Sequence, residues 1–335
     1  MRATRLRLAI LLMAVVAVAA LGVRRYLALR DLAAHATDDP EQARLVWDDV
    51  LHFAEAHEAI STGAEPVATL RDAYFGQASA GLEDYVQLYG GGPERLAAAL
   101  VRWPGFYAGL LRMPALISRQ ESDVRQLYRT LRQLYPPAKF PPVYYVVGHL
   151  RVGGFVRPQG LVIGTDIYGW QEDTNLGEFP NGVGAIRPSE QMPYQIAHEL
   201  IHYQQYARNQ LALTSLDDLL SRTINEGAAD FLGELISGGH VNSRAHAYGR
   251  EHEKDLWCRF RSEMTGEDLG DWFFVRPETP DWPQDLGYFM GYQITAAYFA
   301  RFPDKAAAID EIIATEDPHL LLVESGYASQ FGDCV

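Results

Sequence analysis

The chain has 335 residues, of which 48% are hydrophobic and 11% aromatic. This composition excludes a disordered chain and supplies enough apolar surface for one large domain or two smaller ones with a packed core. The formal net charge is −14, and no run rich in lysine and arginine follows the N-terminal segment. The charge therefore argues against nucleic acid as a partner, because phosphate binding needs a basic surface.

Residues 1–30 are predicted to form a signal or anchor segment. Arginines precede the uncharged run 8–23, and Arg24 and Arg25 follow it. The run is slightly shorter than the roughly 20 residues of a membrane-spanning helix, and the small residues Ala17-Val18-Ala19 offer a cleavage site, so a signal peptide remains open. We expect an exported protein, periplasmic or otherwise extracytoplasmic, held at the membrane by this segment.

Residues 38–135 are predicted to form a helical N-terminal region. Asp39-Pro40-Glu41 is typical of a helix start, because proline is tolerated in the first turn. Further helices are expected at 66–75, 81–89, 93–103 and 118–135. Aromatic side chains in this region are expected to pack in the core, with a role in a substrate groove as the less favoured alternative: Trp47, Tyr74, Tyr85, Tyr89, Trp103 and Tyr107.

A proline-rich stretch at 136–142 predicts a boundary, and 140–335 is expected to be a second domain. Strands are predicted at 143–148 and 160–164, where β-branched and aromatic residues gather, with Gly153-Gly154 in a turn between them. A long loop, 166–189, leads into a helix. The expected fold is α+β and mainly helical, with a small sheet before a two-helix metal-binding core.

The stretch from Gln195 to Tyr203 contains an H-E-x-x-H motif. On a helix, His198 and His202 lie one turn apart on the same face, where both can bind one metal ion. Glu199 then lies beside the metal and can take a proton from a metal-bound water. The motif predicts a zinc hydrolase with Glu199 as the catalytic base.

A second element, Asn225-Glu226 followed by Asp230, supplies the third ligand that a catalytic zinc ion requires. Glu226 and Asp230 are also one helical turn apart, so one can bind the metal while the other supports a ligand. Asp230 is placed to accept the second ring N–H of a ligating histidine, and Asn225 is expected beside it in the outer shell. The alternative is a capping box, in which the Glu226 side chain only accepts a hydrogen bond from the backbone N–H at a helix start at Thr223. The upstream motif favours ligation.

His198-Glu199-x-x-His202 followed by Asn225-Glu226-x-x-x-Asp230 resembles the gluzincin metallopeptidases, the thermolysin-like clan. The resemblance implies that His198, His202 and Glu226 bind Zn²⁺, that Glu199 is general base and acid, and that Asp230 supports a ligating histidine. It also implies a strand edge beside the cleft that pairs with an extended peptide, whereas the residues alone fit a purely scaffolding role of the strands equally well. The gap before Glu226 is longer than in thermolysin, and the metzincin continuation H-x-x-G-x-x-H is missing after His202.

The segment 286–294 places two glycines on one helical face, with Tyr288 and Tyr292 beside it. Close packing is the commoner interpretation; the functional one is that either tyrosine donates a hydrogen bond to the oxyanion of the tetrahedral intermediate. Three histidines compete for that role, although each is expected at the surface or at a helix end: His240, His246 and His252. The resemblance extends to a poorly characterised family of predicted zinc-dependent proteases related to a gliding-motility lipoprotein. It is carried by the strand pair between Gly148 and Gly164, the motif His198 to His202, Glu226, the segment 287–292 and residues 325–327.

The predicted function is hydrolysis of peptide bonds in a peptide or protein substrate. Two alternatives remain: an envelope-associated structural or interaction protein with a non-catalytic zinc site, and a zinc amidohydrolase acting on a non-peptide amide. Cys258 and Cys334 are too few for a disulfide framework, and either one bond or two separate thiols fits the sequence. Composition and motifs do not determine the oligomeric state.

Overall fold

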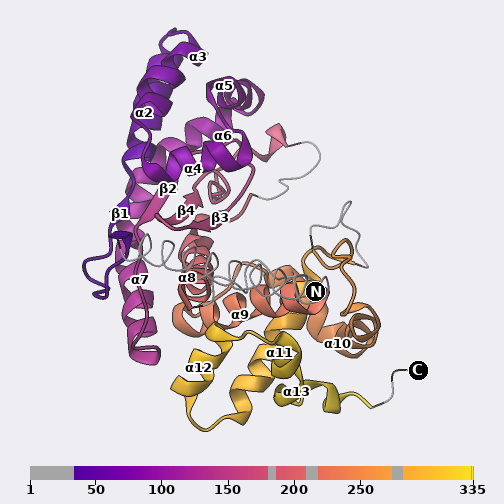
Figure 1. Cartoon of the computed structure of the whole chain (residues 1–335). Helices are drawn as coiled ribbons and strands as arrows, with labels where there is room; N and C mark the ends of the chain where they lie inside the picture. Colours follow the sequence, from indigo (N-terminus) through magenta and orange to yellow (C-terminus); the bar gives the residue numbers. More distant parts are fainter. Residues whose placement is uncertain (1–33, 180–185, 209–217, 274–281, 333, 335) are drawn as a thin grey trace, which may run out of the picture.

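The computed structural model describes residues 34–179, 186–208, 218–273, 282–332 and 334. Within these ranges the fold is α+β and mainly helical, with one small sheet, which confirms the predicted fold class. In Figure 1 the sheet and most of the N-terminal helices form the upper part of the molecule and the C-terminal helices form the lower part, with the long helix 113–134 running down beside them.

The sheet has four strands in the order β1-β2-β4-β3: β1 (Leu45–Val46), β2 (Val143–Val146), β3 (Gly154–Arg157) and β4 (Gly160–Gly164). β1 and β4 both run parallel to β2, whereas β3 is antiparallel to β4 and forms an edge. The two predicted strands are confirmed as β2 and β4, which are buried along their length. β3 was not predicted, because its first residue, Gly154, was expected in a turn between the two strands.

The helices of the N-terminal region are α2 (Asp48–Ser61), α3 (Pro66–Thr69), α4 (Ala80–Tyr89), α5 (Pro93–Arg102), α6 (Pro104–Gly109) and α7 (Met113–Leu134). The predicted helix start at Pro40 is wrong, because the chain first pairs Leu45 and Val46 with β2 and becomes helical only at Asp48. The region is therefore not helical throughout.

The lower part contains α8 (Met192–Arg208), α9 (Leu219–Ser237), α10 (Ser243–Glu263), α11 (Leu286–Arg301), α12 (Lys305–Ala314) and α13 (Pro318–Ser325). α8 lies between the sheet and α9, and α9 in turn packs on α11 (Figure 1). Gly238 ends α9 with a φ of 82°, a conformation that glycine adopts without strain.

The two predicted regions share one sheet and one hydrophobic core. β1 comes from the N-terminal region and pairs with β2 beyond the proline-rich stretch. α7 also packs against both α8 and α9. The N-terminal helices are consequently part of the frame around α8 and α9.

α9 and α11 approach each other at two glycines. A Cβ atom on Gly291 would lie 1.8 Å from the carbonyl oxygen of Thr223, and one on Gly227 would lie 2.1 Å from the carbonyl carbon of Gly291. Both separations are far inside van der Waals contact. Since Gly227 follows Glu226 directly, this contact fixes the rotation of α9 and thus the direction in which Glu226 points.

Cys258 in α10 forms a disulfide with Cys334 near the C-terminus, with a Cα–Cα distance of 5.3 Å. Of the two alternatives left open by the sequence, the structure shows the bonded one. The bond ties the end of the chain to α10, where Phe331 packs on Trp257.

The prediction of an exported protein held at a membrane is contradicted by the structure. Within the described ranges, no helix is long and apolar enough to cross a bilayer. The predicted signal or anchor at residues 1–30 itself lies outside the described residues. The predicted localisation is therefore withdrawn.

Replacing Gly291 by alanine should destabilise the protein by about 1–3 kcal/mol, because the added methyl group must push α9 and α11 apart. Urea unfolding measures the change in free energy. Gly332→Ala is the matched control, because a Cβ there has no neighbour within 4 Å. Equal stability of the two variants would contradict the close helix contact.

Candidate metal centre

α8 supplies the two histidines of the H-E-x-x-H motif. Pro193 stands in its first turn, where the missing N–H costs no hydrogen bond, and the helix continues without interruption to Arg208. The Nε2 atoms of His198 and His202 lie 3.0 Å apart, as expected for residues one turn apart on the same face. Because α8 is enclosed by the sheet, α9 and neighbouring helices, its polar side chains need partners inside the protein.

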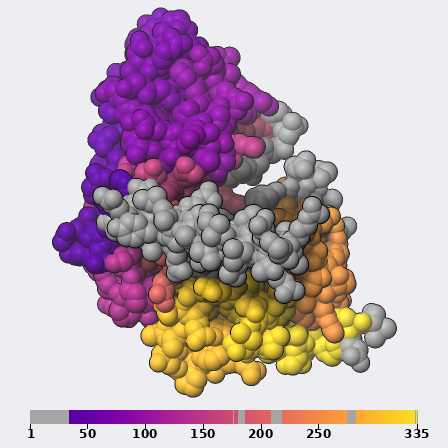
Figure 2. All heavy atoms as spheres, viewed as in Figure 1, coloured from indigo at the N-terminus to yellow at the C-terminus, as the bar shows by residue number. Residues whose placement is uncertain are grey.

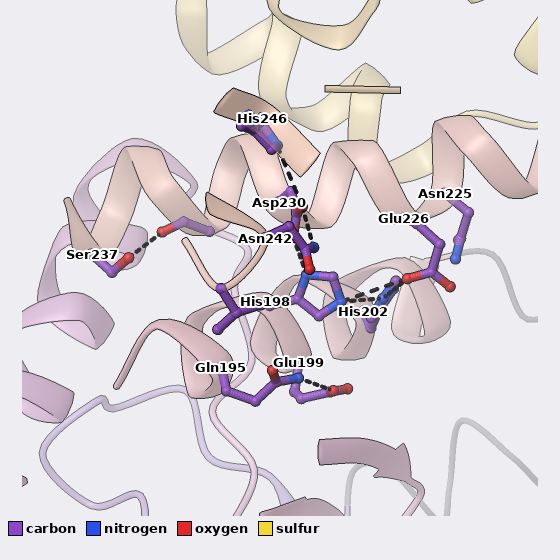
Figure 3. A network of polar contacts seen from close by, with 12 residues as sticks. Gln195, His198, Glu199, His202, Asn225, Glu226, Asp230, Ser237, Asn242 and His246 are labelled. Atoms are coloured by element: carbon purple, nitrogen blue, oxygen red, sulfur yellow. Dashed lines mark hydrogen bonds and ion pairs between the residues drawn. The ribbon is translucent and has the colours of Figure 1, made fainter. Parts of the chain in front are cut away.

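α9 supplies Glu226. Its Oε2 atom lies 3.1 Å from Nε2 of His202 and 3.6 Å from Nε2 of His198 (Figure 3). The capping-box alternative is excluded, because α9 begins at Leu219 and its N-cap is Asp218, which accepts a hydrogen bond from the Ser221 N–H. Glu226 is thus inside the helix and faces the histidines, as the sequence predicted.

The partners of the other ring nitrogens indicate the tautomer of each neutral ring. Nδ1 of His198 lies 2.8 Å from Oδ1 of Asp230, and Nδ1 of His202 lies 2.7 Å from Oε1 of Gln205. Both oxygens are acceptors, so each neutral imidazole carries its proton on Nδ1 and presents a lone pair on Nε2.

Two nitrogen lone pairs and one carboxylate oxygen therefore point at a common position. With both rings neutral this arrangement is repulsive, and a proton or a metal ion among the three atoms relieves it. His198, His202 and Glu226 can together hold a metal ion. Elsewhere in the described part of the chain, no other group of three histidine, cysteine or acidic side chains converges in this way.

The electrostatics of the pocket favour a cation. Burial acts to lower the pKa of His198, yet its hydrogen bonds to Asp230 and Glu226 outweigh burial and raise that pKa well above its usual range. Burial alone would raise the pKa of Glu226, but the charge and hydrogen bonds of the two histidines hold it well below its usual range. The field that favours a proton on His198 also favours a metal ion, which competes with that proton.

Asp230, 1% exposed, is the acceptor behind His198, as predicted. Its second oxygen, Oδ2, accepts a hydrogen bond of 2.7 Å from Nδ2 of Asn242, and Nε2 of His246 lies 3.8 Å from the same oxygen (Figure 3). The sequence missed both of these partners. His246 stands in the first turn of α10, which agrees with the predicted helix end, but its side chain is buried behind Asp230 and not at the surface.

The sequence analysis also did not predict the hydrogen-bond partner of His202. Gln205, three residues further along α8, accepts from Nδ1 of His202 and donates through Nε2 to the backbone carbonyl of Asn225 over 3.1 Å. Asn225 was predicted in the outer shell, and it contacts Gln205 through its main-chain oxygen. The i, i+3 spacing of His202 and Gln205 was the signal that could have revealed this pair.

Glu199 is 5% exposed, and burial raises its pKa. Its Oε1 atom accepts a hydrogen bond of 2.7 Å from Nε2 of Gln195, one turn earlier on α8 (Figure 3). Tyr168 donates in turn to Oε1 of Gln195 over 2.6 Å. A Cβ atom on Gly154 would lie 2.8 Å from Oε1 of Glu199, so the edge strand β3 passes directly beside the carboxylate.

The three donor atoms open onto a cavity of about 590 Å³. Figure 2 shows the surface hollowed between the N-terminal and C-terminal parts of the molecule. The walls come from β3, α4, α8, α9 and α11, and include Tyr89, Phe155, Arg157, Tyr206, Arg222 and Tyr288. Tyr89 was expected mainly as a packing residue, and the structure places it in the cavity wall.

Only one of the two candidate tyrosines reaches the site. Tyr288 lines the cavity with its ring centroid 6.0 Å from that of His198. Burial, with the nearby Glu226 charge, raises the pKa of Tyr288 well above its usual range, so its hydroxyl remains a donor. Tyr292 instead packs on His246, with ring centroids 4.7 Å apart, and does not line the cavity.

The competing histidines also lie away from the cavity. His240 packs against His246 with tilted rings whose centroids are 4.0 Å apart. His252 stacks on Tyr248, and its Nδ1 lies 2.9 Å from the backbone oxygen of the same tyrosine. Within the described residues, none of the three histidines lines the cavity onto which His198, His202 and Glu226 open.

Asp230→Ala should weaken metal affinity by about 10–100-fold, because His198 loses the acceptor that fixes its tautomer and orientation. Titration against a competing chelator measures the affinity. Asp72→Ala removes an exposed carboxylate from the N-terminal region and serves as the control. If both variants bind metal as tightly as the unmodified protein, Asp230 does not support the site.

The chain matches no family model, no curated protein and no solved structure. The resemblance to the gluzincins therefore stays a prediction that rests on its motif.

Proposed function

We propose that the protein is a zinc-dependent peptidase in which His198, His202 and Glu226 hold the metal. The observation that carries the proposal is the triangle of donor atoms, with sides of 3.0, 3.1 and 3.6 Å. Zinc bonds of about 2.0–2.2 Å in tetrahedral geometry require donors about 3.3 Å apart. Two imidazoles and one carboxylate also form a ligand set that zinc favours.

The adjoining cavity supports a catalytic role over a structural one. A structural zinc site is closed by a fourth protein ligand, whereas a catalytic site has three and leaves a position for water or substrate. Among the described residues, three donors converge, and they line a cavity large enough for part of a peptide.

Zinc bound here would polarise a substrate carbonyl and lower the pKa of a water molecule toward about 7. Glu199 accepts the proton of the attacking water and passes it to the leaving amine. The hydrogen bond from Gln195 orients this carboxylate, and the pKa raised by burial suits a group that must both accept and release a proton. The Tyr288 hydroxyl donates a hydrogen bond to the developing oxyanion.

The edge strand β3 provides a place for the substrate backbone. Its other side pairs with β4, and its residues Phe155 and Val156 line the cavity. An extended peptide that pairs with this edge runs past Glu199, because Gly154 brings the strand close to that carboxylate. This placement favours a peptide over a small non-peptide amide.

Glu199→Gln should retain zinc and lose about 10²–10⁴-fold in the rate of peptide hydrolysis, because a neutral amide cannot accept the proton. Metal analysis and mass spectrometry of a digested peptide library measure the two properties. Glu55→Gln, on the exposed face of α2, is the control. Full activity in Glu199→Gln protein would refute the mechanism, and stoichiometric zinc without any cleavage by the unmodified protein would favour a structural site.

Tyr288→Phe should lower kcat by about 10²–10³-fold, the loss found when one oxyanion donor is removed. Tyr292→Phe is the matched control, because this tyrosine lies on the same helix but outside the cavity. Steady-state kinetics with one cleaved peptide give kcat for both variants. Equal effects of the two substitutions would remove Tyr288 from the proposed mechanism.

A further inference from the structure

The cavity next to the metal-binding atoms has an unusual charge pattern for this chain. The protein carries 43 acidic and 29 basic residues. Yet the acidic side chains in the cavity wall are Glu199 and Glu226 of the site itself, and the wall also holds two arginines, Arg157 and Arg222. The arginines stand on opposite sides, one on β3 and one on α9.

Arg157 already has an anionic partner. Its Nε atom lies 3.3 Å from Oδ1 of Asp84, whose side chain is 9% exposed. This ion pair fixes the guanidinium against the sheet and neutralises its charge. Arg157 therefore shapes the cavity wall without providing a free positive charge.

Arg222 is different. It lies one turn before Glu226 on α9, and its Nη1 atom is 3.4 Å from Oε1 of Glu226, a long contact to a carboxylate whose other oxygen faces the histidines. Its Nε atom is buried and has no hydrogen-bond partner among the described residues. The side chain is 36% exposed and lines the cavity. The part of its side chain that lines the cavity is thus open to a ligand, whereas the buried Nε is not.

A guanidinium with free donors at the wall of a cavity is suited to a carboxylate, which it can bind through two parallel hydrogen bonds. Glu226 joins Arg222 to the site, with one oxygen toward Arg222 and the other toward His202. The guanidinium is therefore separated from the metal-binding atoms by a single carboxylate group. In an extended peptide, at about 3.3 Å per residue, this corresponds to one or two residues.

We infer that Arg222 binds a carboxylate of the substrate, so that the site selects peptides with an acidic side chain or a free C-terminus within one or two residues of the cleaved bond. The selection of cleaved peptides rests on the proposed function, whereas the binding of a carboxylate at Arg222 requires only a metal-loaded site. The competing explanation is that Arg222 only compensates the charge of Glu226 within α9.

Binding of small metal-chelating probes separates these explanations without any turnover. The probes are the monohydroxamates of succinic, glutaric and adipic acid, each compared with its primary-amide counterpart on zinc-loaded protein by calorimetry. The hydroxamate occupies the metal, and the chain length varies the position of the carboxylate. We expect the best-fitting acid to bind about tenfold or more tightly than its amide, as for hydrogen bonds between charged groups.

Arg222→Gln should abolish this preference while leaving the affinity for the amide probe unchanged, and Arg222→Lys should retain part of it. Arg208→Gln is the control, because Arg208 has the same charge but pairs with Asp310 outside the cavity. Zinc content is measured for every variant. The inference would be overturned if Arg222→Gln lowered the affinity for the amide probe as much as that for the acid probe. It would also be overturned if the unmodified protein bound acid and amide probes with equal affinity.

The source of the carboxylate is resolved with two sets of peptides on the unmodified enzyme. One set exchanges glutamate for glutamine near the cleaved bond, and the other compares free with amidated C-termini. Faster cleavage of the glutamate peptides assigns Arg222 to a side chain, and faster cleavage of the free C-termini assigns it to the chain end. A retained probe preference without cleavage of any peptide refutes the peptidase and supports the carboxylate site.

Discussion

The hydrogen bond between His198 and Asp230 joins the two helices on which the site depends. It connects α8 to α9, fixes the proton of His198 on Nδ1, and thereby turns the Nε2 lone pair toward His202 and Glu226. The Gln205 contact does the same for His202. Because each ring has a hydrogen-bond partner at Nδ1, both Nε2 atoms stay directed at Glu226. The rest of the fold supports this contact, with α11 behind α9 and the sheet beside α8.

The local part of this site could be predicted from the sequence, because a helix fixes the relation between residues one turn apart. His198 with His202, and Glu226 with Asp230, follow from spacing alone. The rest could not be predicted because it depends on packing between distant segments. Asn242 and Tyr168 reach the site from other parts of the chain. The sequence likewise could not choose between Tyr288 and Tyr292, since the rotation of α11 against α9 decides which one faces the cavity.

The fold class was predictable and its details less so. Buried apolar runs identified β2 and β4, whereas β3 begins at a glycine and was not identified. β3 matters for the site because it places an edge strand next to Glu199. No helix begins at Pro40, because Leu45 and Val46 are stabilised more by backbone pairing with β2 than they would be in a helix. This short pairing also ties the N-terminal helices to the sheet, and α4 thereby places Tyr89 in the cavity wall. The N-terminal region thus contributes to the proposed substrate site.

The central claim is that α8 and α9 together hold one zinc ion. Anomalous diffraction at the zinc absorption edge, from crystals of the zinc-loaded protein, tests it most directly. The account predicts a single strong peak about 2.0–2.2 Å from Nε2 of His198, Nε2 of His202 and an oxygen of Glu226. A peak bound by the two histidines without Glu226, or a peak elsewhere in the protein, would contradict the two-helix site.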